Sequence, residues 1–85
     1  MKFRFTAHAL AEIERRGLDR SAVERMLGNP EQAREEKLGR EALQSRVNFP
    51  DGEYLLRAIV DRRSDPPAVV TVYRTRYIAK YWRQE

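Results

Sequence analysis

The period of the hydrophobic pattern changes at Pro30, and this change orders the helices and strands along the chain. Before Pro30, apolar residues recur three or four positions apart, as on one side of a helix. After Pro30 they alternate with polar residues, as in a strand with one buried face. A chain of 85 residues is long enough for one domain only. We therefore expect residues 1–85 to form a single α+β domain.

Two short helices are predicted in the first third of the chain. Residues 7–16 form the first, with Thr6 as its N-cap and Gly17 as the residue that ends it. Asp19 caps the second helix, which stops at the Gly-Asn-Pro run of residues 28–30. Because the link between the helices is so short, they are expected to form an N-terminal helical hairpin.

Alternating segments and turn residues predict a four-stranded antiparallel sheet in the remainder of the chain. The last of these segments is β-branched at most positions, which is typical of a strand. Residues 1–5 are a candidate for a further short strand, and residues 76–85 for a short helical or irregular segment packed on the sheet. The helical hairpin should cover one face of the sheet and leave the other open for a ligand. The four expected strands are residues 32–36, 42–49, 54–61 and 68–75.

The composition excludes several kinds of site. The chain has no cysteine and one histidine, so it can build neither a thiolate nor a multi-histidine metal site. A site made only of carboxylates stays open in principle, but no clustered acidic motif suggests one. No apolar run approaches the roughly 20 residues of a membrane span. We expect a cytoplasmic protein without a metal ion or other cofactor.

Positive charge is concentrated near the C-terminus. The net charge is +4, yet the first three quarters of the chain are almost neutral. Residues 66–84 contain no acidic side chain. Localised positive charge attracts phosphate backbones and releases their counterions on binding. The basic residues of this segment are Arg74, Arg76, Lys80 and Arg83.

His8 is a candidate for proton transfer, because histidine is the one side chain that titrates near neutral pH without help from its surroundings. It could take a proton from a ribose 2′-hydroxyl or give one to a leaving oxygen. The alternative is a polar residue near a helix start that is hydrogen-bonded to neighbouring backbone. Its position in the sequence leaves both interpretations open.

Two arginines fall inside predicted strands. Arg46 should point to the open face of the sheet, because its apolar neighbours face the helices. Arg57 lies among apolar residues, where a buried and unpaired charge would be very costly. Its partner could be Asp61 or Glu53. It could equally be a phosphate, which a guanidinium binds with two parallel hydrogen bonds.

The densest pattern of aromatic and cationic residues begins in the last predicted strand. Thr71 and Tyr73 share one side of that strand, and Arg74 lies on the other. Interleaved rings and cations suit single-stranded RNA, whose bases stack while its phosphates are held. Tyr81 and Trp82 could instead simply cap the sheet. The expected RNA-binding residues are Arg46, Thr71, Arg74, Arg76, Tyr81 and Trp82.

The chain also holds the side-chain types that cleave RNA without a metal ion. Attack by the 2′-hydroxyl on the neighbouring phosphorus needs a base, an acid and a cation that stabilises the crowded phosphorane. Possession of these types does not prove that they meet in space. The expected catalytic residues are His8, Arg57, Tyr73 and Lys80.

Short motifs, in order along the chain, resemble a family of small uncharacterised bacterial domains. They are Phe5-Thr6-x-His8-Ala9, then Arg16-Gly17-Leu18, and later Arg57, the strand Val69-Val70-Thr71-Val72-Tyr73 and Lys80-Tyr81. That family looks related to ribonuclease toxins of the BrnT and RelE type. The resemblance implies a compact toxin fold, RNA as substrate, including ribosome-bound mRNA, and an antitoxin protein as partner. It implies roles for His8, Arg57, Thr71, Tyr73, Lys80 and Tyr81.

Two alternatives to a toxin remain open at this point. The chain could be a non-catalytic module that binds RNA or a protein, in which case His8 would have no role in binding. It could also be a small homodimer that pairs through the exposed edge of the strand at residues 68–75.

Overall fold

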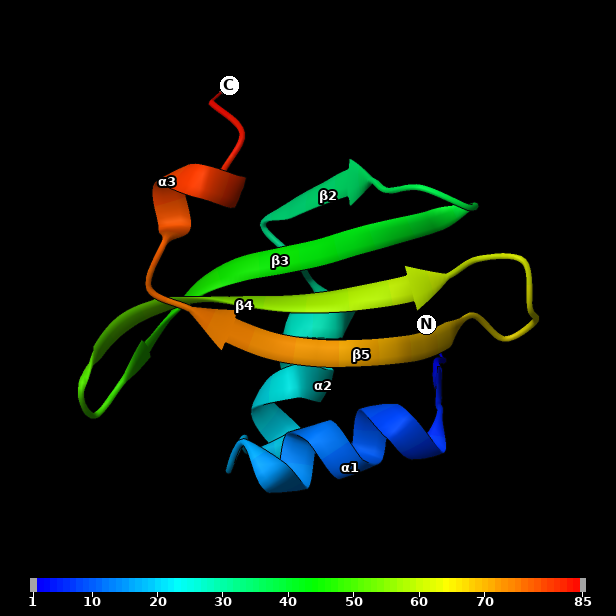
Figure 1. The fold of residues 1–85 in the computed structure, drawn as a ribbon, viewed down its shortest axis with the longest axis horizontal. Helices are drawn as coiled ribbons and strands as arrows, with labels where there is room; N and C mark the ends of the chain where they lie inside the picture. The colour runs from blue at the N-terminus through cyan, green and yellow to red at the C-terminus, as the bar shows by residue number, and fades with distance from the viewer. Residues whose placement is uncertain (1, 85) are drawn as a thin grey trace.

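The computed structural model describes residues 2–84 and confirms the α+β class (Figure 1). Met1, the first residue of the expected first strand, and Glu85, the last residue of the expected tail, lie outside the described residues. No helix within residues 2–84 is long and apolar enough to cross a membrane. The elements are β1 (Arg4–Phe5), α1 (Ala7–Arg15), α2 (Arg20–Gly28), β2 (Gln32–Glu35), β3 (Arg40–Phe49), β4 (Gly52–Asp61), β5 (Ala68–Thr75) and α3 (Ile78–Tyr81).

Local capping sets where the two long helices begin and end, as the sequence predicts. The side chain of Thr6 accepts a hydrogen bond from the backbone N–H of Ala9 at the start of α1. Asp19 accepts from the N–H of Ser21 at the start of α2. Gly17 has a φ of +64°, the left-handed conformation that reverses the chain after α1.

The sheet has five strands and is mixed, so the expected four-stranded antiparallel sheet is wrong in both respects. Its order is β1-β5-β4-β3-β2, and β1 pairs with β5 in parallel. The pairing is short but real: the N–H of Arg4 donates to Pro67 O (2.9 Å) and that of Thr6 to Val69 O (3.1 Å). A two-residue strand has too little alternation to reveal its partner or direction in the sequence.

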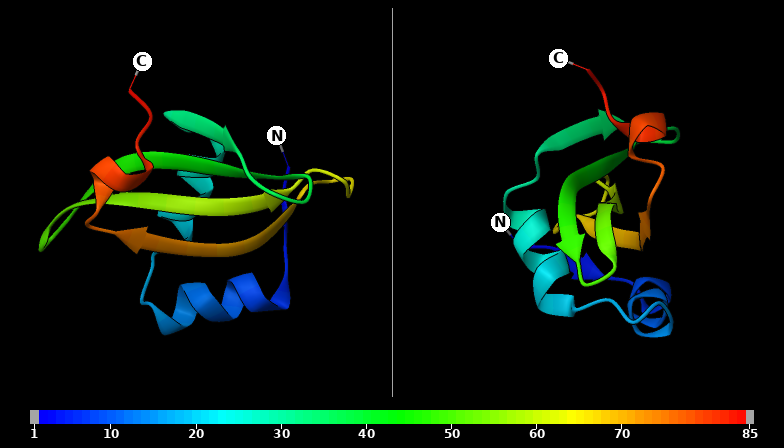
Figure 2. Two further views of the ribbon diagram at one scale, coloured as in Figure 1. Left: turned by 45° about the horizontal axis from the view of Figure 1, so that its top comes forward. Right: turned by 90° about the vertical axis from the view of Figure 1, so that its left-hand side faces the viewer.

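The helices α1 and α2 lie on the same side of the sheet, α1 against β5 and α2 against β3 and β4, and α3 lies on the other side (Figures 1 and 2). The core forms between the sheet and the first two helices, and its central side chains are completely or almost completely buried. The tail after β5 is helical at α3, as expected. It contacts the sheet face that was expected to be open for a ligand. The core includes Ala9, Ile13, Val23, Met26, Leu27, Leu43, Leu56, Ala58, Val60, Val69 and Val72.

The hairpin between β2 and β3 turns through two residues in the left-handed region. Leu38 has a φ of 63° and Gly39 a φ of 72°, and the N–H of Arg40 donates to Lys37 O across the turn. Two central residues with positive φ define a type I′ turn, for which Asn-Gly is the preferred pair. Leucine is a poor choice at the first of these positions, and its side chain is 75% exposed, so packing gives little in return.

We predict that Leu38→Asn stabilises the protein. Asparagine tolerates the left-handed conformation, and the gain should be up to about 1 kcal/mol in the free energy of unfolding. Leu38→Val is the matched control, because a β-branched side chain is disfavoured at positive φ and should lower stability. Chemical denaturation of the three proteins measures both changes. Equal stability of the two variants would contradict this account of the turn.

Candidate functional site

Four polar side chains form one row across the middle of the sheet. The strand register places Gln32 of β2 opposite Gln44 of β3, Gln44 opposite Arg57 of β4, and Arg57 opposite Tyr73 of β5. Residues paired in this way point to the same face. Their neighbours in sequence, such as Leu43 and Val72, belong to the core under α1 and α2. The row therefore lies on the face opposite those two helices.

Arg57 is the centre of this row and is only 3% exposed. Its Nε donates to Oε1 of Gln44 at 2.8 Å, and its Nη1 donates a short hydrogen bond to the Tyr73 hydroxyl. The carboxylate of Glu36 is 3.6 Å from Nη2. Gln44 and Tyr73, which bond to this cation, are therefore uncharged, and the carboxylate of Glu36 forms only a long ion pair with it.

The expected partners of Arg57, Asp61 and Glu53, are not the partners found. Each is four residues away in the same strand, which is about 13 Å along it. Asp61 instead accepts from Arg63, and these hydrogen bonds lower the pKa of Asp61 to about 2. Side chains on neighbouring strands are closer than side chains four positions apart on one strand, so Arg57 is paired across the sheet.

The C-terminal segment covers the guanidinium of Arg57. The ring of Tyr81 stacks on it, with 4.3 Å from Cζ to the ring centroid. The backbone carbonyl of Tyr81 accepts from Nη1 of Arg34 (2.7 Å) and Nε2 of Gln44 (3.1 Å). Further along, the side chain of Gln32 exchanges hydrogen bonds with the backbone of Arg83. The row is thus the floor of a polar layer between the sheet and residues 78–84.

Tyr73 is held in its protonated form. Its partial burial raises the pKa of the hydroxyl above the ordinary value, against the lowering influence of the Arg57 guanidinium. The nearby Tyr81, whose ring centroid is 6.4 Å away, acts in the same direction as burial. A phenol that keeps its proton at neutral pH can donate a hydrogen bond or a proton to an oxygen placed beside it.

The structure brings together three of the four expected catalytic residues. Arg57 touches Tyr73, and Nζ of Lys80 is 5.3 Å from the centroid of the Tyr81 ring that covers Arg57. His8 is not part of this group. It is exposed on α1, which packs on the other face of the sheet.

The expected RNA-binding residues divide between two places. Arg46 and Trp82 join the same face as Arg57, with the guanidinium 4.2 Å from the indole centroid, and Glu31 pairs with Arg46 at 3.0 Å. Thr71 lies on this face as well, two residues from Tyr73. Arg74 and Arg76 are elsewhere, beside Asp51 at the end of the β3–β4 hairpin.

Sequence reasoning missed the residues that complete the polar layer. The alternation along residues 42–49 places Gln44 on the side away from the core, where a polar side chain is expected to be solvated. It is in fact completely buried, because residues 78–84 fold over it. The pattern of β3 alone therefore could not reveal the role of Gln44, or those of Gln32 and Arg34.

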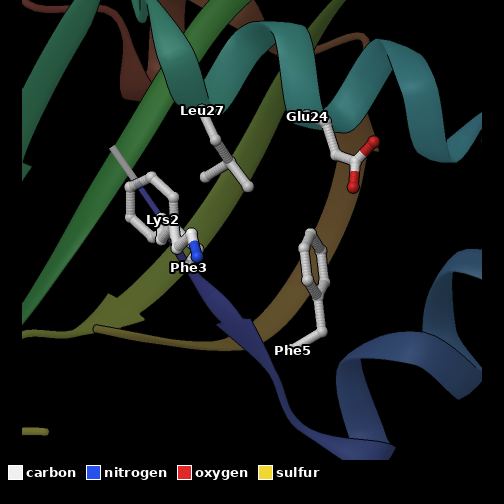
Figure 3. Close-up of a pocket in the computed structure, with 5 residues that line it drawn as sticks. All are labelled: Lys2, Phe3, Phe5, Glu24 and Leu27. Carbon is white, nitrogen blue, oxygen red and sulfur yellow. The ribbon is translucent and has the colours of Figure 1, made fainter. Parts of the chain in front are cut away.

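A separate hollow of about 310 Å³ lies between β1 and α2 (Figure 3). Phe3, Phe5 and Leu27 line it, and Lys2 and Glu24 complete the lining. These residues offer an apolar surface with one charge of each sign, and they include none of the expected site residues. Among residues 2–84, no three His, Cys, Asp or Glu side chains are grouped so that they could hold a metal ion.

Comparison with known proteins supports a family but no activity. Residues 5–74 match the model of a family described as a domain of unknown function (DUF4258). The match contains the whole row from Gln32 to Tyr73 and ends before α3. No curated protein and no solved structure shows a significant similarity to the chain. None of these comparisons shows a similarity to the BrnT or RelE toxins.

We predict that Gln44→Leu destabilises the protein although the two side chains are similar in size. The change leaves Nε of the buried Arg57 without its acceptor, which should cost about 1–3 kcal/mol in the free energy of unfolding. The double variant Gln44→Leu/Arg57→Met should lose less than the sum of the two single variants, because it removes both partners. Chemical denaturation of all four proteins measures the coupling. Additive losses would show that this hydrogen bond does not matter for stability.

Proposed function

The chain belongs to the DUF4258 family, and we propose that it is a metal-independent ribonuclease toxin of the BrnT and RelE type, working in the cytoplasm with an antitoxin partner. The supporting observation is the contact of Arg57 with the Tyr73 hydroxyl, with Lys80 nearby on α3. A cation and a protonated phenol are side by side at the centre of one sheet face. This pair supplies the two roles that phosphodiester cleavage needs at the phosphorus and at the leaving oxygen.

In the proposed reaction the ribose 2′-oxygen attacks the neighbouring phosphorus and the bond from phosphorus to O5′ breaks. The proton of the 2′-hydroxyl passes to water. Arg57 stabilises the negative charge that develops on the phosphorane oxygens, and Lys80 adds a second positive charge. Tyr73 gives its proton to the departing O5′. The products are a 2′,3′-cyclic phosphate and a 5′-hydroxyl end, and no metal ion or redox partner takes part.

The phosphate can reach Arg57 only after residues 78–84 move away from the row. Arg57 is only 3% exposed beneath Tyr81 and its neighbours, so its N–H groups are closed to an incoming phosphate while this segment is in place. Arg57, Gln44 and Tyr73 lie on three paired strands, so we propose that they stay fixed while α3 moves. Lys80 would return with α3 and close over the bound RNA.

The near-complete burial of Arg57 favours a second function, a non-catalytic RNA-binding module. Gln44, Tyr73, Glu36 and the Tyr81 ring together surround the guanidinium, so it could serve only to hold α3 on the sheet. RNA would then bind to the exposed aromatic and cationic residues, among them Arg46 and Trp82. Binding without cleavage distinguishes this function from the first.

We predict that purified protein cleaves single-stranded RNA in excess EDTA and that Tyr73→Phe lowers the rate by about 100-fold or more. Phenylalanine keeps the ring but removes the proton donor. Because the pKa of Tyr73 is raised, its hydroxyl stays protonated up to about pH 9. Loss of this proton should therefore not lower the rate between neutral pH and about pH 9. Gel analysis of a labelled RNA measures the rate at each pH.

His8→Gln is the matched control, since His8 lies on the α1 side and should leave the rate unchanged. An RNA with a single 2′-deoxy residue at the cleavage position should be resistant there. If His8→Gln abolishes cleavage and Tyr73→Phe does not, the proposed assignment of the catalytic face is wrong. If RNA binds and is never cleaved, the binding module is favoured.

Expression in bacteria tests the proposed toxicity. Wild-type protein without an antitoxin should slow growth, whereas Tyr73→Phe should relieve the effect and His8→Gln should not, for the reasons given above. Growth curves of the three strains, with immunoblots to show equal amounts of protein, measure this. Normal growth of cells that accumulate folded wild-type protein would count against a toxin.

A further inference from the structure

A second basic site lies at the C-terminal end of β5, on the opposite side of the sheet from Arg57. Tyr73 and Arg74 are consecutive, so their side chains point to opposite faces. Arg74 pairs across the sheet with Leu56, a core residue, and therefore emerges on the side of α1 and α2. The side chain of Arg74 lines a hollow of about 490 Å³, here named the basic groove. The groove is lined by Arg16, Tyr54, Arg74, Thr75, Arg76 and Tyr77.

Aromatic rings and the hairpin turn hold the guanidiniums of this groove in place. The Cζ of Arg74 is 4.5 Å from the Phe49 ring centroid and 4.2 Å from that of Tyr54. Arg76 stacks on Tyr54 as well, at 4.7 Å, and donates to the backbone carbonyl of Asp51. Guanidiniums stacked in this way keep their N–H groups in a fixed plane, which suits two-pronged binding of a phosphate.

The groove is short of negative charge. Arg74 and Arg76 share one carboxylate, that of Asp51, at 3.7 and 3.2 Å. Arg16 shares the carboxylate of Glu12 with Arg15. The three guanidiniums that line the groove thus share two carboxylates, one of which also pairs with Arg15, and none of the lining residues is acidic. This excess of positive charge favours an anionic ligand.

The same groove offers a surface on which a base can stack. Tyr77 is 76% exposed, the largest exposed fraction among the described large hydrophobic side chains. Its backbone N–H donates to Oγ1 of Thr75, which fixes where the residue leaves the strand. An exposed ring beside ordered cations binds single-stranded nucleic acid by stacking one base while the cations hold the phosphates.

We propose that the basic groove binds the backbone phosphates of single-stranded RNA on Arg74 and Arg76, with a base stacked on Tyr77. The choice of RNA rests on the proposed function and deepens it: the groove holds nucleotides next to the one that is cleaved at Arg57. The groove and the Arg57 row lie on the two sides of the C-terminal half of β5. One RNA strand that passes around the end of β5 reaches both.

The test measures binding of a non-cleavable probe, so that it does not depend on catalysis. The probe is a fluorescein-labelled 2′-O-methyl oligouridylate of roughly ten nucleotides, and its anisotropy is followed at several salt concentrations. Arg74→Gln/Arg76→Gln should weaken binding at least tenfold and lower the slope of log affinity against log salt concentration by about 1.4. Tyr77→Ala should weaken binding by about tenfold, and its exposure makes a folding defect unexpected.

Arg4→Gln/Arg63→Gln is the matched control, because it removes the same charge at the opposite end of β5. Arg4 pairs with Ala68 at the start of that strand, and Arg63 lies in the loop before it. This variant should lose less than threefold in affinity. Arg74→Lys/Arg76→Lys should keep the salt dependence and lose several-fold in affinity, because lysine cannot form the stacked, two-pronged contact.

Several results would overturn the proposal. One is wild-type affinity and salt dependence in Arg74→Gln/Arg76→Gln, and another is an equal loss in the control pair. Displacement of the probe by polyglutamate at equal charge concentration would assign the groove to an acidic protein. Equal binding of a DNA probe of the same length would overturn the choice of RNA, because the groove would then recognise phosphates without regard to the sugar. Tyr73→Phe should bind the probe normally, so failure of the proposed cleavage and failure of the groove are separate results.

Discussion

The buried guanidinium of Arg57 is the constraint on which the sheet and the C-terminal segment both depend. A charge removed from water is tolerated only when its surroundings supply hydrogen bonds in return. Here they come from β3 through Gln44, from β5 through Tyr73, and from the residue after β2 through Glu36. A register shift of any of these strands by one residue would turn its partner to the other face and leave the charge unpaired. The cation thereby fixes the register of the central strands.

The same charge explains why α3 is placed where it is. Four residues form only one helical turn, which has little stability of its own. Tyr81 supplies a ring for the Arg57 guanidinium and a carbonyl for Arg34 and Gln44, so this turn is held by the polar row beneath it. The family match stops at residue 74, whereas the row is entirely inside it. The row thus lies within the part of the chain that matches the family, and its cover comes from the residues that follow.

What the sequence predicts well is local, and what it misses is a matter of contacts between distant segments. Thr6 and Asp19 cap their helices through bonds to residues two or three positions away, so both helices can be located from the sequence. The parallel pairing of β1 depends on backbone bonds to residues more than 60 positions away. The partners of Arg57 are likewise on other strands. Arg57 is paired, as its burial requires, but Asp61 and Glu53 are not its partners because both lie four residues away in its own strand.

His8 lies on the other side of the sheet from the remaining expected catalytic residues. It is the most obvious proton carrier in the sequence, but α1 packs on the sheet through Ala9 and Ile13, and His8 remains exposed on that side. The catalytic site proposed on the face of Arg57 therefore works without histidine. Partial exclusion of water raises the pKa of Tyr73 and strengthens the attraction between Arg57 and a phosphate. In the proposed mechanism residues 78–84 move away to admit the RNA and then close over it, and this second step excludes water from the phenol and the guanidinium.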